Sequence, residues 1–258
     1  MLALLALIAT PTYAGPADHN TTLTVLASPQ TSRDSVMAGL RIDMSDGWKT
    51  YWRAPGDAGI PPLIQWVGST NVGSIAFHWP VPDVFDQDGM RSIGYYGTVT
   101  IPVEIFPNDV GDIRLSGSIN IGVCEEICIP VNLEFDTLLP LDAPRDAAIT
   151  AALMNRPLTA SEASVGAVTC TIAPTSGGMQ ITTRTALSQQ DPEEIIIEIS
   201  DPYVWVSEPD VTRTATHITA TSDLIHVDGT SFAVDRSGIR ITVLGQNRAV
   251  DIQGCTAS

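Results

Sequence analysis

The stretch "IRLSGSINIGVCEEICIPVNLEFDTLL", residues 113–139, decides the fold, because it reads as two strands joined by a short turn. Near its middle Cys124 and Cys128 lie only four positions apart, with Glu125 and Glu126 between them. In a straight strand two such positions are about 13 Å apart, whereas a disulfide needs Cα atoms within roughly 7 Å. A bond between these cysteines therefore requires a turn at "EEI", either as the tip of a hairpin or as one helical turn.

Similar strand-like runs fill both halves of the chain. They are short, rich in Val, Ile and Thr, and separated by Gly, Pro, Asn and Asp, as in all-β sandwiches. In the first half they include "TTLTVLAS", "VMAGLRIDM", "IQWVGS" and "VTIPVEIF". In the second half they include "VGAVTCTIAP", "MQITTRTAL", "EEIIIEIS", "THITATSDL" and "GIRITVLG". The sequence predicts an all-β protein with two β-sandwich domains.

One helix is expected between the two halves, in "LDAPRDAAITAALMNRPLTA". Asp142 can act as its N-cap, Pro144 suits a first helical turn, and the Ala-rich run stops before Pro157. We predict a first domain over residues 15–141, a linker helix within 142–157 and a second domain over 158–258.

The N-terminus predicts export. An apolar run from Leu2 to Ile8 precedes "TYA", a small-residue cleavage pattern that ends at Ala14, although the positively charged start of a signal peptide is missing. We predict a signal peptide over residues 1–14; the alternative is a buried N-terminal strand or helix. No later stretch reaches the roughly 18 to 20 apolar residues that span a bilayer. The mature chain is therefore expected to be exported and not membrane-spanning, in a compartment that permits disulfides.

The charge of the chain excludes one class of partner. It carries 29 acidic and 13 basic side chains, for a formal net charge of −16. No cluster of basic residues is present to neutralise phosphates, so we expect no nucleic-acid binding.

The four cysteines allow three pairings. A bond between Cys170 and Cys255 would tie the start of the second domain to its end, and closing so long a loop is worth about 4 to 5 kcal/mol in the chain-entropy model. A bond between Cys124 and Cys128 closes almost no loop, so it constrains the unfolded chain little. Three interpretations of this close pair remain: a structural disulfide, a metal site and a redox centre.

The metal reading has little support, because no histidine lies within forty residues of Cys124 and zinc sites normally need four ligands. A Cu(I) site formed with Met90 is the alternative; we expect no metal and no cofactor. In the redox reading, Glu125 and Glu126 disfavour a thiolate on either neighbouring sulfur. The pair therefore suits a disulfide that is attacked by the thiolate of another protein.

Three ordered motifs carry a family resemblance: "DGWKTYWRAPGDAGIPPLIQW", "FHWPVPDVFDQDGMRSIGYYGTVTIPVEI" and "GVCEEICIPVNLEF". Over roughly residues 17–140 the chain resembles the N-terminal periplasmic domain of the DsbD-type thiol:disulfide interchange proteins. It is most similar to the branch linked to suppression of copper sensitivity, which has a C-x-x-x-C-x-P motif.

The resemblance implies an immunoglobulin-like β-sandwich in which Cys124 and Cys128 form the redox pair, with Cys128 expected to form the bond to a partner. The segment from Val84 to Tyr96 matches the family's cap loop, which shields the cysteines. Its candidate residues, which would cover the sulfurs, are Phe85, Met90, Tyr95 and Tyr96. Cys170 and Cys255 are then left as a structural disulfide.

The resemblance also implies partners. These would be thioredoxin-like periplasmic proteins or a membrane electron-transfer protein, in pathways of disulfide isomerisation and cytochrome c maturation. Because no membrane or thioredoxin-like domain follows the second β domain, we expect a free-standing periplasmic relay. The rival hypothesis is a non-catalytic periplasmic binding module with two inert disulfides and a role in copper handling.

Overall fold

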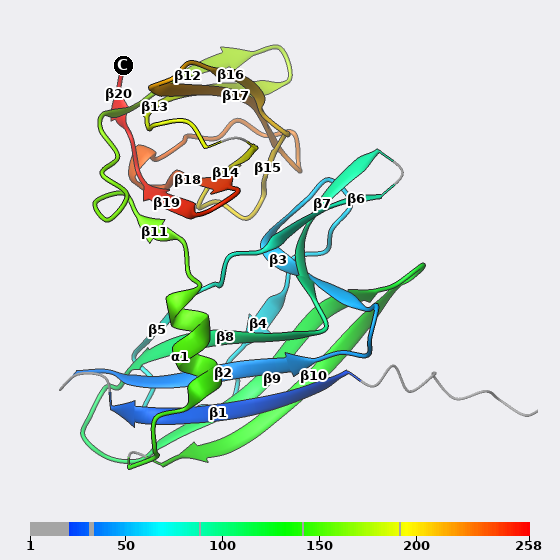
Figure 1. The fold of residues 1–258 in the computed structure, drawn as a ribbon, viewed down its shortest axis with the longest axis vertical. Helices are drawn as coiled ribbons and strands as arrows, with labels where there is room; N and C mark the ends of the chain where they lie inside the picture. The colour runs from blue at the N-terminus through cyan, green and yellow to red at the C-terminus, as the bar shows by residue number, and fades with distance from the viewer. Residues whose placement is uncertain (1–20, 31–33, 88, 141, 191) are drawn as a thin grey trace, which may run out of the picture.

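The computed structural model describes residues 21–30, 34–87, 89–140, 142–190 and 192–258. These residues form an all-β protein of two immunoglobulin-like sandwich domains, with one α-helix described between them, as predicted (Figure 1). The proposed signal peptide, residues 1–14, lies outside the described residues.

The first domain packs two antiparallel sheets face to face. One sheet has the order β1-β2-β8-β5, formed by β1 (Thr22–Gln30), β2 (Val36–Asp43), β8 (Thr98–Phe106) and β5 (Ser74–Phe77). The other has the order β10-β9-β3-β7-β6, formed by β10 (Cys128–Leu139), β9 (Ile113–Cys124), β3 (Lys49–Gly56), β7 (Met90–Tyr96) and β6 (Asp83–Gln87). A short strand, β4 (Leu63–Gln65), also pairs with β9.

The core of this domain lies between the two sheets. Leu40 and Ile101 from the first sheet meet Leu115 and Ile119 from the second, and all four are essentially inaccessible to solvent. Burying each such side chain contributes about 1.5 to 3 kcal/mol. This packing fixes β9 firmly along most of its length, so that its end at Cys124 is held in place.

The second domain is a smaller sandwich around its own core. One sheet has the order β11-β19-β18-β14, formed by β11 (Leu158–Thr159), β19 (Ala249–Gln253), β18 (Arg240–Gly245) and β14 (Glu193–Glu198). The other has the order β15-β17-β13-β12-β20, formed by β15 (Val204–Val206), β17 (His217–His226), β13 (Gly178–Ala186), β12 (Val168–Thr175) and β20 (Thr256–Ala257), with β16 (Asp210–Arg213) also on β17. A 3₁₀ turn covers Arg236–Gly238.

The linker helix is shorter than the sequence indicated. Helix α1 runs over Ala147–Met154. Its N-cap is Asp146, whose carboxylate accepts hydrogen bonds from the backbone N–H groups of Ala148 and Ile149, so the expectation that Asp142 caps it was wrong. Asp146 is the acid that directly precedes the Ala-rich run, which is where an N-cap can satisfy the first free N–H groups. Within the described residues no helix is long and apolar enough to cross a membrane.

Two segments without a clear strand pattern are strands. The stretch "SDGWKTYWRAPGDAGIPP" contains β3, and the expected cap loop from Val84 to Tyr96 is largely the hairpin of β6 and β7. In β3 the pairing register with β7 shifts between Tyr51 and Gly56. Such a bulge breaks the strict two-residue period that identifies a strand from sequence.

Candidate functional site

The close cysteine pair lies at the tip of the β9–β10 hairpin. Cys124 is the last residue of β9 and Cys128 the first of β10, and the register pairs them directly. Their Cα atoms are 4.1 Å apart and their sulfurs are bonded. The N–H of Glu125 donates to the carbonyl of Ile127 at 3.2 Å, which closes the turn. Of the two geometries that the spacing allowed, the chain adopts the hairpin tip.

The two halves of the disulfide differ in exposure. Cys124 is completely buried, whereas Cys128 is exposed. Ile127, next to Cys128 at the tip, is 67% exposed, and the side chains of Glu125 and Glu126 also face solvent. Of the two cysteines, Cys128 is therefore the one that a partner can approach from solvent.

A buried tyrosine contacts both sulfurs. The hydroxyl oxygen of Tyr51, on β3, lies 3.1 Å from Cys124 Sγ and 3.2 Å from Cys128 Sγ. Gly122 makes room for its ring: a Cβ there would lie 3.2 Å from Tyr51 Cε2. Because neither sulfur of a disulfide carries a proton, the hydroxyl is the donor. Burial raises the pKa of Tyr51, so the hydroxyl keeps its proton at neutral pH.

The only lysine of the chain lies beside the disulfide. Lys49 pairs with Cys124 across β3 and β9, and directly paired residues share one face of a sheet with Cβ atoms about 4.5 to 5.5 Å apart. Its side chain is buried (4% exposed) and forms no ion pair within the part of the chain that the structure describes. Burial lowers the pKa of Lys49.

Phe85 and Tyr96, two of the four expected cap residues, lie on this same face. Tyr96 pairs with Lys49 on its other side, and the rings of Phe85 and Tyr96 meet edge to face at 4.6 Å. The Lys49 ammonium lies 4.8 Å from the centre of the Phe85 ring. Phe85 therefore packs on the residues that flank Cys124, and its role as the cap stays a prediction.

Of the other two expected cap residues, Tyr95 points into the core, and Met90 lies at the far end of β7 from Tyr96. Tyr95 is buried in the core on the opposite face of β7, and its hydroxyl donates to the carbonyl of Pro80 at 2.9 Å. Met90 begins β7 and is half exposed (51%). Neighbouring residues of a strand face opposite sides, so Tyr95 and Tyr96 cannot both face the cysteines.

The sequence comparison identifies the first domain. Residues 22–140 match the family described as the N-terminal domain of the thiol:disulfide interchange protein DsbD. Residues 22–140 form a DsbD-type N-terminal domain. None of the curated proteins matches the chain.

A solved structure has the same two-domain fold. It is the crystal structure of the N-terminal periplasmic domain of ScsB from Proteus mirabilis, with a TM-score of 0.67. The two sequences are 24% identical, and the alignment covers 97% of each chain.

The second disulfide lies far from the DsbD-type domain in sequence. Cys170 on β12 is bonded to Cys255, with Cα atoms 5.8 Å apart, and Cys170 is completely buried. The bond joins the first long strand of the second domain to the chain end beside β20. Its position agrees with the structural role that we expect for it.

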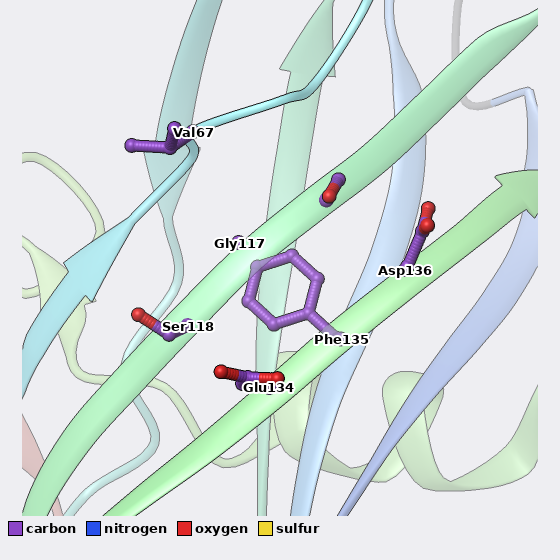
Figure 2. A pocket seen from close by; sticks show the side chains of 7 residues that line it. Val67, Gly117, Ser118, Glu134, Phe135 and Asp136 are labelled. Carbon is purple, nitrogen blue, oxygen red and sulfur yellow. The ribbon is translucent and has the colours of Figure 1, made fainter.

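The open hollow on the outer side of β9 and β10 contributes nothing to the site. Figure 2 shows the ring of Phe135 lying over Gly117, between Ser118, Glu134 and Asp136. The hollow lies several residues from Cys124 along β9. Within the described residues no three side chains of His, Cys, Asp or Glu gather as metal ligands do.

Sequence reasoning missed Lys49 and Tyr51 as residues of the DsbD-type site. Both lie in "GWKTYWR", which has no clear strand pattern, and more than seventy residues separate them from the cysteines. The one available signal was that Lys49 is the only lysine in the chain.

Proposed function

We propose that the chain exchanges thiols and disulfides with partner proteins through the Cys124–Cys128 pair. The observation that carries the proposal is the asymmetry of this disulfide: Cys128 is exposed at a hairpin tip, and Cys124 is buried behind it against the Tyr51 hydroxyl. The DsbD-type family of the first domain supports the same chemistry.

The exposure of Cys128 supports one order of the steps. A thiolate of a donor dithiol attacks Cys128 Sγ, the S–S bond breaks, and its electron pair leaves on Cys124 Sγ as a thiolate. The mixed disulfide is then resolved by the second thiol of the donor, which loses its proton and displaces the Cys128 thiolate. The donor becomes a disulfide and the chain a dithiol, so two electrons have moved; reversing these steps passes them to an acceptor disulfide.

The Tyr51 hydroxyl assists the bond-breaking step. In the disulfide it donates to a neutral sulfur, which is a weak acceptor. Once Cys124 leaves as a thiolate, the same hydroxyl donates to an anion, and charge-assisted hydrogen bonds are roughly twice as strong. The interaction therefore strengthens as the reaction proceeds, which is the requirement for catalysis.

The partners that fit this surface are small dithiol proteins of the thioredoxin-like class. Ile127, next to Cys128, presents exposed apolar surface, and so does Tyr96, which lies in the same row of paired residues on β7; a transient docking site has such surface. The family and the periplasmic domain of similar fold favour a periplasmic location.

The proposal is tested by a redox titration with mass-spectrometric assignment of both disulfides. We expect Cys124–Cys128 to titrate in the range of exchange proteins, and Cys170–Cys255 to remain oxidised below about −300 mV. Incubation of Cys124→Ala with a thioredoxin-like protein should trap a mixed disulfide through Cys128, whereas Cys128→Ala should trap much less.

The same titration can also contradict the proposed exchange function. A Cys124–Cys128 pair that stays oxidised below about −300 mV, with no trapped partner in either variant, would identify an inert structural bond. The chain would then be a binding module.

A further inference from the structure

The second domain contacts the hairpin that bears Phe85, which we call the cap hairpin (β6 and β7). Figure 1 shows this hairpin rising from the first domain beside the second. Across the hairpin Phe85 pairs with Ser92 and Asp86 pairs with Arg91. Successive strand residues face opposite sides, so Phe85 points to the face of the disulfide while Arg91 points to the other.

Arg91 is bound by two carboxylates of the second domain. Its Nη1 lies 2.8 Å from Glu194 Oε2, on β14, and 3.2 Å from Glu208 Oε1, which follows β15. The Arg91 side chain is largely buried (16% exposed). Its backbone is also held, because the N–H of Asp57 donates to the Arg91 carbonyl at 3.1 Å. The second domain thus binds the cap hairpin on the side opposite to Phe85.

A second arginine fixes the same interface. Arg53, on β3, forms two hydrogen bonds with Glu198 at 3.0 and 2.9 Å and one with Thr242 at 3.1 Å. Its guanidinium lies 3.8 Å over the ring of Trp52. The apolar core of the first domain also continues into this contact through Ile196, Leu244 and Ala249.

These contacts assign a role to the second domain. We propose that Glu194 and Glu208 hold the cap hairpin through Arg91 in the position where Phe85 packs on Lys49 and Tyr96, and so limit access to the disulfide. Arg91 is a positioning residue that acts through Phe85. Cys128 is itself exposed at the tip of β9–β10, so the held hairpin narrows the approach to Cys128 Sγ without closing it. The approach widens when the interdomain ion pairs release the hairpin.

This inference extends the proposed function. Its test uses dithiothreitol and no partner protein, so its outcome is independent of whether the chain exchanges disulfides with partners. The Cys124–Cys128 bond should be reduced about five to ten times faster in Arg91→Met and in the double variant Glu194→Gln/Glu208→Gln than in the unaltered chain. The reduction potential of the pair should not change, because the ion pairs control access and do not contact the sulfurs.

Two controls separate access from loss of folding. The Cys170–Cys255 bond of the same molecules should be reduced at an unchanged rate, and Arg114→Met, which breaks the exposed pair with Asp136, should leave both rates unchanged. On a Phe85→Ala background, Arg91→Met should produce no further acceleration, because the residue through which it acts is gone.

Three results would overturn the inference. The rate of Cys124–Cys128 reduction could be unchanged in both interdomain variants. Both disulfides could be accelerated equally, which would indicate general unfolding. The effects of Arg91→Met and Phe85→Ala could multiply, which would show that Arg91 acts independently of the cap.

Discussion

At the scale of single residues, Tyr51 and Lys49 make the tip of β9–β10 more than a short cross-link. The hydroxyl of Tyr51 touches both sulfurs, and Lys49 places a buried cation in the strand position paired with Cys124. The sequence led us to expect that Glu125 and Glu126 would control the charge around the sulfurs. Both glutamates face solvent, so water screens their effect more strongly than that of the buried lysine.

We predict that Tyr51→Phe slows reduction of Cys124–Cys128 by about tenfold, because the departing thiolate loses a hydrogen bond worth roughly 1.5 kcal/mol. The second-order rate constant with dithiothreitol measures the effect. Tyr203→Phe, which removes the hydroxyl of an exposed tyrosine in the second domain, is the matched control and should leave the rate unchanged. A Tyr51→Phe variant as fast as the control would show that the hydroxyl only fills space.

Lys49 is predicted to lower the stability of the fold, because its ammonium is buried without a carboxylate partner in the described part of the chain. Lys49→Met should raise the free energy of unfolding at pH 7 by about 1 kcal/mol. The folded chain has the lower lysine pKa, so between that pKa and 10.5 the unfolded chain binds more protons and the unaltered protein gains stability as pH rises. The advantage of Lys49→Met should therefore shrink as the pH approaches 10.5.

Urea unfolding at pH 7 and at pH 10, followed by tryptophan fluorescence, measures this difference. Lys49→Arg retains the charge and should not be stabilised. A Lys49→Met variant that is less stable than the unaltered protein at pH 7 would show that the cation–π contact with Phe85 outweighs the cost of burial.

At the scale of elements, the hairpin tip could be predicted and the surrounding site could not. The spacing of Cys124 and Cys128 excludes a straight strand, so covalent geometry alone forces the turn. The strand β3 escaped prediction because its register shifts between Tyr51 and Gly56 and because Gly and Pro follow directly. Its position beside β9 is a long-range contact that no local pattern encodes.

The cap was predicted as a loop for a similar reason. Its residues "DVFDQDGMRSIGYY" include Asp and Gly at the turn, and the alternation of each short strand is too brief to identify it. Which aromatic faces the cysteines follows only from the pairing of Phe85 with Ser92 and of Tyr96 with Lys49.

The turn after helix α1 supplies an acid-sensitive element. The Glu162 carboxylate accepts hydrogen bonds from Arg156 at 2.7 and 2.8 Å and from the N–H of Thr159 at 2.8 Å, while the Thr159 hydroxyl accepts from the N–H of Glu162 at 3.2 Å. This reciprocal arrangement is a capping box. The hydrogen bonds from Arg156 and then those from Thr159 lower the pKa of Glu162 to about 2.

We predict that Glu162→Ala destabilises the protein at pH 6 and that the deficit disappears in acid. A carboxylate with a lowered folded pKa stabilises the fold above its ordinary value of 4.5, and this contribution is lost as pH falls through about 2. Urea midpoints at pH 6, 4 and 2.5 should show the two curves converging. Asp112→Ala removes an exposed acid of the first domain, and its urea midpoints should follow those of the unaltered protein at every pH.

At the scale of the whole molecule, two disulfides of different loop length divide two tasks. Cys170–Cys255 spans 85 residues and joins the ends of the second domain, whereas Cys124–Cys128 spans four. The sequence could predict this division, because loop length is read directly from residue numbers. The contact of the second domain with the cap hairpin could not be predicted, because Arg53 and Arg91 meet Glu198 and Glu194 across more than one hundred residues.

The division makes a final prediction about stability. Removing the disulfide that closes the long loop, with Cys170→Ala/Cys255→Ala, should lower the free energy of unfolding by about 4 to 5 kcal/mol. Removing the disulfide that closes the short loop, with Cys124→Ala/Cys128→Ala, should lower it by only about 2 kcal/mol. Fluorescence of Trp205, the only tryptophan in residues 158–258, reports on the second domain, and the other four report on the first. The long-loop variant should shift the Trp205 transition to lower urea, and the short-loop variant should leave it in place. A larger loss from the short loop would show that the bond at the hairpin tip staples the first domain, and it would remove the reason to regard that bond as one kept for exchange.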